Sequence, residues 1–165
     1  MRVLGIDTAL RTTGVAVVER NGNVWRAVEY GLIKNTTSAP HSVCLLRLFE
    51  GVREIIGRTK PDAVAIEGIF YSKSIKVAVI LGEARGTVIA ACGSMGVPAY
   101  EHSPRSVKRA LVGFGGAAKG QVSKMAMAIL GLKETPPEDA ADALGIAVCH
   151  LQQHGPLAVQ QLKAL

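Results

Sequence analysis

The order of apolar and polar residues along the chain predicts strands near its start and helices toward its end. Three apolar runs open the sequence, and the pair Asn21-Gly22, which is typical of a hairpin turn, separates the second run from the third. After Pro40, apolar residues recur every three or four positions until about Gly57, as they do along one face of a helix. The predicted strands are 3–7, 14–18, 24–33, 63–67 and 98–102, and the predicted helices are 38–57, 74–92, one that opens at Ser103-Pro104, 119–130 and 138–151.

This order of elements predicts an α/β fold. Three strands, then alternating helices and strands, then three helices indicate a mixed sheet of five strands, antiparallel in its first half, with helices on both faces. A chain of 165 residues, 48% of them hydrophobic, suffices for one compact domain and is too short for two. We therefore expect a single domain over 1–165, with a tail at 155–165 that frays.

Charge and cysteine content narrow the class of protein. The formal net charge is +6 and the isoelectric point is about 9.5, which favours a polyanionic partner such as nucleic acid. An acid at position 7 argues against a signal peptide, and no apolar run reaches the ~18 residues that span a bilayer, so we expect a cytoplasmic protein with no membrane partner. Cys44, Cys92 and Cys149 form no C-x-x-C motif and are expected to be free, buried thiols.

Four acidic residues lie where the predicted elements would bring them together. Asp7 ends the first predicted strand and Glu67 ends the fourth, each after an apolar run. If those strands are parallel neighbours, their carboxyl ends meet at one crevice, where sites of α/β proteins usually form. Asp139 and Asp142 are three residues apart and therefore project from one face of the last predicted helix, whose alanines permit close approach to the sheet.

Carboxylates gathered in this way repel one another unless cations lie between them. Oxygen ligands suit Mg²⁺ or Mn²⁺, and two such ions about 3.5–4 Å apart would clamp the attacking and leaving oxygens of a phosphodiester. We therefore predict two Mg²⁺ ions, replaceable by Mn²⁺, at a catalytic site formed by Asp7, Glu67, Asp139 and Asp142. The alternative is that the strand-end acids are merely solvated and that the helical pair favours the positive helix N-terminus.

Six motifs, in this order within residues 3–150, closely resemble the RuvC family of Holliday junction resolvases. They are Gly5-Ile6-Asp7 with Thr13-Gly14, Ala65-Ile66-Glu67, Gly82-Glu83-Ala84-Arg85-Gly86, Val107-Lys108, the Gly-rich stretch 113–122, and Asp139-Ala140-Ala141-Asp142-Ala143-Leu144. Each motif alone is short, but six in order at compatible spacing are specific. The resemblance implies an RNase H-like fold, a homodimer, and Mg²⁺-dependent nicking of two symmetric strands in a four-way DNA junction during recombination and repair. The four acids fall on the positions of the family's catalytic acids.

Two positions depart from the family's usual pattern. Thr8-Ala9 stands where Pro-Gly is usual, and because Ala resists the positive φ that Gly permits, the loop after Asp7 is expected to differ in shape. Gly145 stands where Ala is common, which is expected to loosen the last helix slightly. The carboxylates themselves are intact.

Basic residues are concentrated in a stretch without acids, from His102 to Lys133. A Gly-rich loop that runs into a helix can place backbone N–H groups against phosphate, so Lys119 at that boundary is predicted to lie nearest the scissile phosphate. The resemblance favours Lys108 and Lys119 as well. The alternative is a solvated basic face. The predicted DNA-binding basic residues are Lys73, Lys76, Arg105, Lys108, Arg109, Lys119 and Lys124.

Phe70 and Tyr71 are adjacent aromatic residues that closely follow Glu67. Their segment is too polar for a buried strand, so we predict that they bind DNA by stacking on unpaired bases. The resemblance implies that role for Phe70 in particular. Packing of both rings beneath the loop is the alternative.

Other interpretations of the sequence remain open. His150 and His154 could share a metal at i, i+4 spacing, but without a third ligand nearby they are expected to be exposed residues at a helix end. The start of the chain also resembles the first phosphate loop of actin-like ATPases, although no second phosphate loop is evident. A junction-binding protein without catalysis is a third possibility. The helix 74–92 is the candidate dimer face, and whether a branch-migration motor complex is a partner stays open.

Overall fold

Five strands form a single sheet in the computed structural model of the protein, which describes residues 1–68, 74–154 and 163–165. The order across the sheet is β3-β2-β1-β4-β5. β1 pairs antiparallel with β2 and parallel with β4, and β4 pairs parallel with β5. The mixed sheet with an antiparallel first half is thus confirmed. The strands are β1 (Arg2–Asp7), β2 (Thr12–Asn21), β3 (Val24–Lys34), β4 (Ala63–Glu67) and β5 (Ala99–His102).

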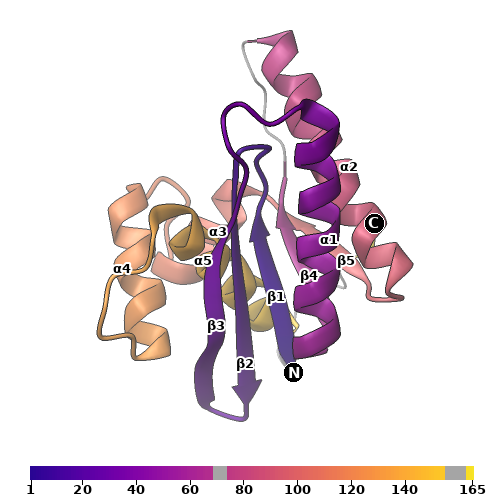
Figure 1. Cartoon of the computed structure of the whole chain (residues 1–165). Helices are drawn as coiled ribbons and strands as arrows, with labels where there is room; N and C mark the ends of the chain where they lie inside the picture. The colour runs from indigo at the N-terminus through magenta and orange to yellow at the C-terminus, as the bar shows by residue number, and fades with distance from the viewer. Residues whose placement is uncertain (69–73, 155–162) are drawn as a thin grey trace.

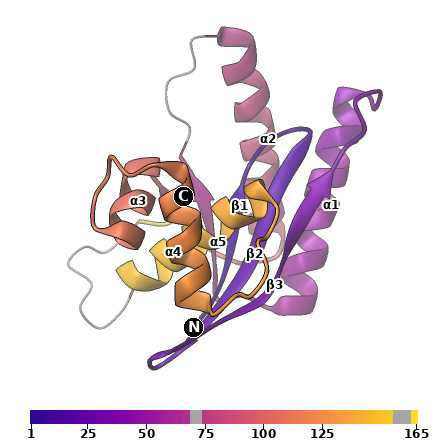
Figure 2. The same cartoon turned by 90° about the vertical axis from the view of Figure 1, so that its left-hand side faces the viewer.

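Helices cover both faces of this sheet, as predicted (Figures 1 and 2). One layer consists of α1 (His41–Thr59) and α2 (Ile75–Ser94). The other layer consists of α3 (Pro104–Val112), α4 (Lys119–Leu130) and α5 (Glu138–Gln153). Every predicted strand and helix is present, and their ends differ from the predicted ends by at most three residues. No helix in the described part of the chain is long and apolar enough to cross a membrane.

Large aliphatic side chains fill the core between the sheet and the α1–α2 layer. Alternate residues of β1 and β4 point into it, because successive side chains of a strand face opposite sides. The second half of α2 contributes its buried face, whereas its first half extends beyond the sheet (Figure 1). The members of this core include Leu4, Ile6, Val17, Leu48, Val52, Ile55, Val64, Ile66 and Val88.

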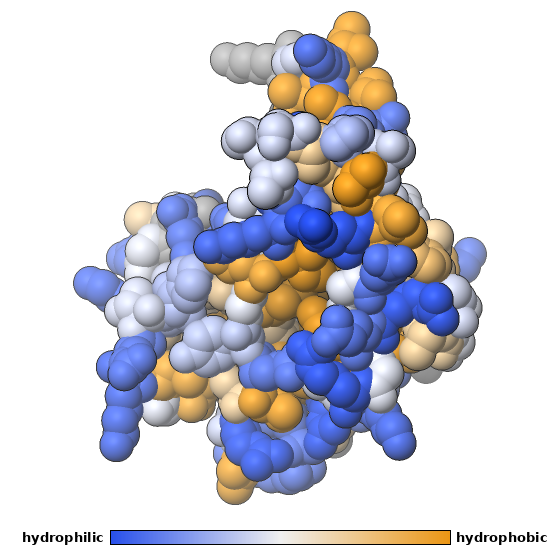
Figure 3. All heavy atoms as spheres, in the orientation of Figure 1, coloured by the Kyte–Doolittle hydropathy of each residue, from blue (hydrophilic) through white to orange (hydrophobic). Residues whose placement is uncertain are grey.

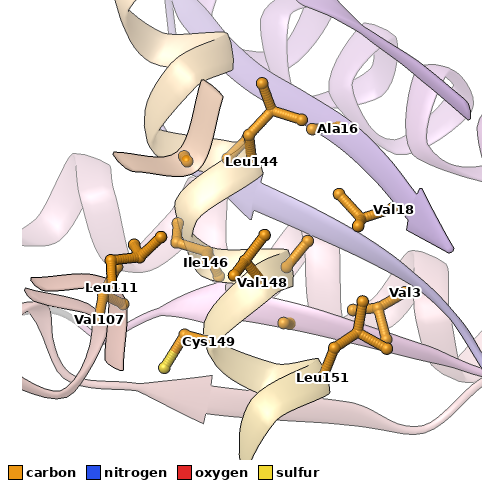
Figure 4. Packing of buried hydrophobic residues seen from close by; sticks show 14 of the residues in the cluster. Val3, Ala16, Val18, Val107, Leu111, Leu144, Ile146, Val148, Cys149 and Leu151 are labelled. Atoms are coloured by element: carbon orange, nitrogen blue, oxygen red, sulfur yellow. The ribbon is translucent and has the colours of Figure 1, made fainter. Parts of the chain in front are cut away.

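The opposite core is built around α5, which is buried on all sides. All nine residues from Ala143 to Leu151 are buried. In Figure 4, Val107 and Leu111 of α3 approach α5 from one side, and Val3 and Val18 of the sheet approach it from the other. A helix that is apolar all round belongs in the interior, so α5 is the central helix of the fold.

Two strand glycines let α5 lie directly on the sheet. A Cβ at Gly5 would come within 2.1 Å of the carbonyl oxygen of Ala143, and one at Gly14 would come within 1.9 Å of the carbonyl oxygen of Asp139. Both distances are far shorter than atoms tolerate, so these positions accept only glycine while α5 stays where it is. The prediction that this helix closely approaches the sheet is confirmed.

Gly145 has a packing role that the sequence did not suggest. It is buried in α5, and a Cβ there would lie 3.1 Å from Cδ1 of Leu111 in α3. The absence of a side chain therefore brings α3 close to α5, in addition to the expected small loss of helix propensity.

The three cysteines are free and buried, as predicted. Burial raises the pKa of Cys92 to about 11 and that of Cys149 to about 12. Both thiols are therefore protonated at neutral pH and behave as small apolar groups.

Candidate active site

Asp7 and Glu67 lie side by side where two parallel strands end. Ile6 of β1 is in register with Ile66 of β4, so the residue that follows each of them is the last of its strand. Both isoleucines point into the α1–α2 core. Because side chains alternate along a strand, Asp7 and Glu67 point to the other face, which α5 covers.

Asp139 and Asp142 reach the same edge of the sheet from the first turns of α5. Gly14, whose backbone lies against the backbone of Asp139, is the residue paired with Asp7 across β1 and β2. Asp142 follows one turn later, on the same side of the helix. The close packing of α5 therefore places its two acids beside the two strand-end acids, and each of the four is partly exposed.

A pocket of about 270 Å³ joins these acids to a lysine. Glu67 and Asp142 line it together with Lys108 of α3, and apolar side chains of three helices form the remainder of the wall. The apolar part of the lining is Pro104, Val107, Val122 and Ile146. A low-dielectric wall strengthens the field of the charges that it surrounds, so this pocket is suited to hold a charged group.

The loop after Asp7 is held by Thr13. Its hydroxyl accepts a hydrogen bond from the Ala9 backbone N–H at 3.2 Å and donates one to the Ala9 carbonyl. Among the described residues, Lys60 is the one non-glycine residue with positive φ, so Ala9 does not require the conformation that favours glycine. The presence of Thr8-Ala9 in this loop is thus compatible with unstrained backbone.

A buried pair of histidines ties β5 to α5, and it corrects the expectation that His150 is exposed. His102 ends β5 opposite Glu67, and its Nε2 lies 2.9 Å from Nδ1 of His150, a distance at which one ring donates a hydrogen bond to the other. His150 is fully buried, and its ring stacks on that of partly exposed His154 at 3.9 Å between centroids. The cause is that β5 and Tyr100 pack against the end of α5.

Burial keeps this histidine pair neutral. It lowers the pKa of His102 to about 4 and that of His150 to about 3, and the neighbouring His154 adds to both shifts. In the neutral state one ring nitrogen can accept the hydrogen that the other ring donates. The pair therefore acts as an uncharged link beside the acidic site.

An ion pair that the sequence pattern did not predict supports the strand ends from the other layer. Arg85 of α2 donates to the carboxylate of Glu101 in β5. The Glu101 side chain in turn lies against Gly68, where a Cβ would come within 2.9 Å of its Oε1. The Gly-Glu-Ala-Arg-Gly motif thus contains the residue that braces the chain just after Glu67.

The predicted basic residues fall into separate places. Lys108 lies in the acidic pocket, whereas Arg105 and Arg109 are exposed on α3 and Lys124 is exposed on α4. Lys76 is exposed on the first turn of α2, in the other layer. Lys119 is the first residue of α4, which confirms its position between the Gly-rich loop and the helix. The predicted residues that lie outside the described part of the chain are Phe70, Tyr71 and Lys73.

Comparison with known proteins gives a family for this arrangement. The family described as crossover junction endodeoxyribonuclease RuvC matches residues 3–150. The chain belongs to the RuvC family. The part of this chain that matches the RuvC family contains all four acids and Lys108.

Relatives in the RuvC family match nearly the whole chain. The crossover junction endodeoxyribonuclease RuvC of Chloroflexus aggregans is 45% identical over 91% of this chain and 92% of its own. That of Caldicellulosiruptor saccharolyticus is 41% identical over 98% of both chains. A solved structure of Thermus thermophilus RuvC in complex with a Holliday junction substrate superposes with a TM-score of 0.92 at 36% identity, and covers 100% of this chain and 99% of its own. The RNase H-like α/β fold is thereby confirmed.

Proposed function

We propose that this protein is a crossover junction endodeoxyribonuclease, which resolves four-way (Holliday) DNA junctions by paired symmetric nicks in recombination and repair. The observation that carries the proposal is the convergence of Asp7, Glu67, Asp139 and Asp142 at one sheet edge, beside Lys108. Whole-length similarity to a RuvC that was solved with a Holliday junction supports the choice of substrate. We also propose that it acts in the cytoplasm, because its relatives in the RuvC family are bacterial and bacterial DNA lies in that compartment.

The carboxylates fit a role as ligands of Mg²⁺, for which Mn²⁺ would substitute. Within the described residues no three His, Cys, Asp or Glu side chains are arranged to hold one ion. Mg²⁺ commonly needs just one or two protein carboxylates, because water and substrate phosphate complete its shell. The four acids could therefore hold two ions once DNA is bound. Such ions would activate the attacking water and stabilise the leaving oxygen.

The basic residues are proposed to hold the DNA backbone around this site. Lys108, which shares the pocket with Glu67 and Asp142, would neutralise a phosphate oxygen there. Lys119 would approach the scissile phosphate from the start of α4, where backbone N–H groups also favour an anion. Flanking phosphates are assigned to Arg105, Arg109, Lys124, Lys73 and Lys76, and stacking on bases at the junction centre to Phe70 and Tyr71.

The first half of α2 is proposed to hold a second copy of the chain. We take the chain as a single domain over 1–165, and this domain supplies one active site. Two symmetric nicks require two active sites and therefore two copies of the chain. Ile75, Val77 and Val79 are exposed by 83%, 47% and 54%, and Figure 3 shows hydrophobic atoms on this projecting part of the molecule. Replacing Ile75 and Val79 with Glu should convert a dimer to a monomer in analytical ultracentrifugation, and a dimer that persists would exclude this face.

A labelled synthetic four-way junction tests the proposed function. With Mg²⁺, the protein should nick two opposite strands at symmetric positions, and without a divalent metal it should bind the junction intact. Binding with no nicks in Mg²⁺ or Mn²⁺ would identify a junction-binding protein without catalysis. Turnover of ATP with no nicking would identify an actin-like phosphate-binding protein instead.

A further inference from the structure

Phe114 is an exposed aromatic residue in a loop made otherwise of small residues. It lies between α3 and α4 in the sequence Gly113-Phe114-Gly115-Gly116, and its side chain is 67% exposed. An exposed large apolar side chain is informative when its surroundings show what it could contact.

The loop is built around this ring and the neighbouring Arg105. A Cβ at Gly116 would lie 2.7 Å from ring atoms Cε1 and Cζ of Phe114, and one at Gly115 would lie 2.6 Å from Cγ of Arg105. Both side chains therefore rest directly on glycine backbone. Gly113 makes the turn that begins the loop, with φ +75°. The ring and the arginine stem thus lie close against the backbone of the same loop.

The surroundings of Phe114 favour a nucleic acid over an apolar protein partner. The ring lines a pocket of about 490 Å³ together with two polar side chains, Gln121 and Lys124. The apolar part of the lining is Val112, Ala117, Met125 and Ala128. No Asp or Glu occurs from His102 to Lys133, while six Lys and Arg do. An aromatic face beside cationic side chains is the chemistry that binds a base and its phosphate.

The helix α3 connects this surface to the active site. Pro104 and Lys108 of α3 line the acidic pocket, whereas Val112, at its other end, lines the pocket of Phe114. A helix of nine residues is about 13 Å long, which corresponds to about four stacked nucleotides. A strand held at the acids could therefore extend along α3 to the ring.

We infer that Phe114 and Arg105 form a second DNA contact, in which the ring stacks on an unpaired base within about four nucleotides of the scissile phosphate and the guanidinium binds the adjacent phosphate. This inference rests on the proposed function, because a four-way junction is the substrate that offers unpaired bases near the cleaved strand. It assigns to Phe114 a specificity role for branched DNA.

Equilibrium binding of a fluorescent junction, without divalent metal and at several salt concentrations, tests the contact. Phe114→Ala should weaken binding about 5- to 140-fold and leave the salt dependence unchanged, since stacking releases no counterions. Phe114→Trp should restore affinity. Arg105→Ala should lower the slope of log K against log salt by about 0.9. Val24→Ala, at an exposed apolar residue of the hairpin, is the control and should bind like the parent.

Junctions with a single abasic site locate the contact. One such site, within four nucleotides of the nick, should abolish the difference between the parent and Phe114→Ala. Equal affinity of Phe114→Ala and parent, or an unchanged difference at every abasic position, would overturn the contact and leave the proposed function standing. Failure of the parent itself to bind the junction would overturn the proposed function.

Discussion

The two faces of the sheet differ in how closely their helices approach the strands. On the α1–α2 face, large side chains such as Leu48 and Ile66 fill the space between helix and strand. On the α5 face, Gly5 and Gly14 have no side chain at two points of closest approach, and there the helix backbone lies against the strand backbone. One face therefore keeps its helices at the distance that side chains set, and the other brings a helix as near as atoms allow.

The difference explains where the acids are found. Side chains of Asp are short, so acids on a helix can meet acids at strand ends only if the helix is close to the sheet. Gly14 provides that approach at Asp139 itself. Both faces contribute a buried core, and the α5 face also sets the geometry of the acids.

The largest effect is expected from adding one methyl group at Gly14. Gly14→Ala places a Cβ where the Asp139 carbonyl oxygen now lies, so α5 must move. We expect a loss of about 3 kcal/mol or more in the free energy of unfolding and a drop in nicking of about 100-fold, because a displacement of 1 Å can have that effect.

Gly31→Ala is the matched control for that substitution. Gly31 is also in a strand, but nothing lies within 4 Å of the Cβ that would be added. Junction nicking should match the parent, and the free energy of unfolding should equal the parent value or exceed it by up to about 1 kcal/mol. Equal behaviour of the two glycine variants would show that close packing of α5 does not set the site.

A cavity on the opposite face should separate stability from activity. Leu48→Ala removes a side chain that is 1% exposed, which should lower the free energy of unfolding by about 2–5 kcal/mol. Nicking per folded molecule should stay at the parent level at a temperature where the variant is folded. A fall in nicking that exceeds the unfolded fraction, measured by circular dichroism, would contradict the claim that the α5 face sets the geometry of the acids.

The regular pattern of the sequence was enough to predict the α1–α2 face. The spacing of apolar residues in α1 and the apolar runs of β1 and β4 identify elements whose side chains do the packing. The adjacency of Asp7 and Glu67 also followed, because parallel strands end at a common edge. The family resemblance then indicated what the acids are for.

The α5 face was harder to predict because its contacts come from residues distant in sequence. His150 was expected to be exposed, yet the uninterrupted run Gly-Ile-Ala-Val-Cys before it signals a helix that is buried all round. The link from His150 to His102 spans 48 positions and depends on where β5 lies. The packing role of Gly145 likewise depends on Leu111, which is distant in sequence and lies beside it in the fold.

The histidine pair should make stability depend on pH. Its lowered pKa values mean that below about pH 6.5 the unfolded chain takes up protons that the folded protein excludes. Stability is therefore complete above pH 6.5 and falls as the pH drops toward 4. Between pH 6.5 and 5 we expect a loss of about 2–4 kcal/mol in urea unfolding.

A double variant tests this pH dependence. His102→Gln with His150→Gln should flatten the slope of stability against pH over this range. If parent stability is constant from pH 6.5 to 5, the buried pair is not neutral as described.

The smallest effect is expected at Gly145. Replacing a helix glycine with Ala typically adds about 0.8–1 kcal/mol of stability, and Gly86→Ala, with open space around its Cβ, should show that gain. Gly145→Ala should gain less, because Leu111 must shift to accept the methyl group. Equal gains in stability for Gly86→Ala and Gly145→Ala, measured by thermal unfolding, would show that the contact between Gly145 and Leu111 does not set the distance between α3 and α5.

Junction nicking by carboxamide variants tests the central claim most directly. Asp7→Asn, Glu67→Gln, Asp139→Asn and Asp142→Asn each keep the side-chain shape and remove one charge, so each should abolish nicking while junction binding is kept or tightened. Glu138→Gln, at the exposed first residue of α5, should nick at the parent rate. A parent-like nicking rate in any of the four variants would contradict the claim that α5 and the strand ends together form one active site.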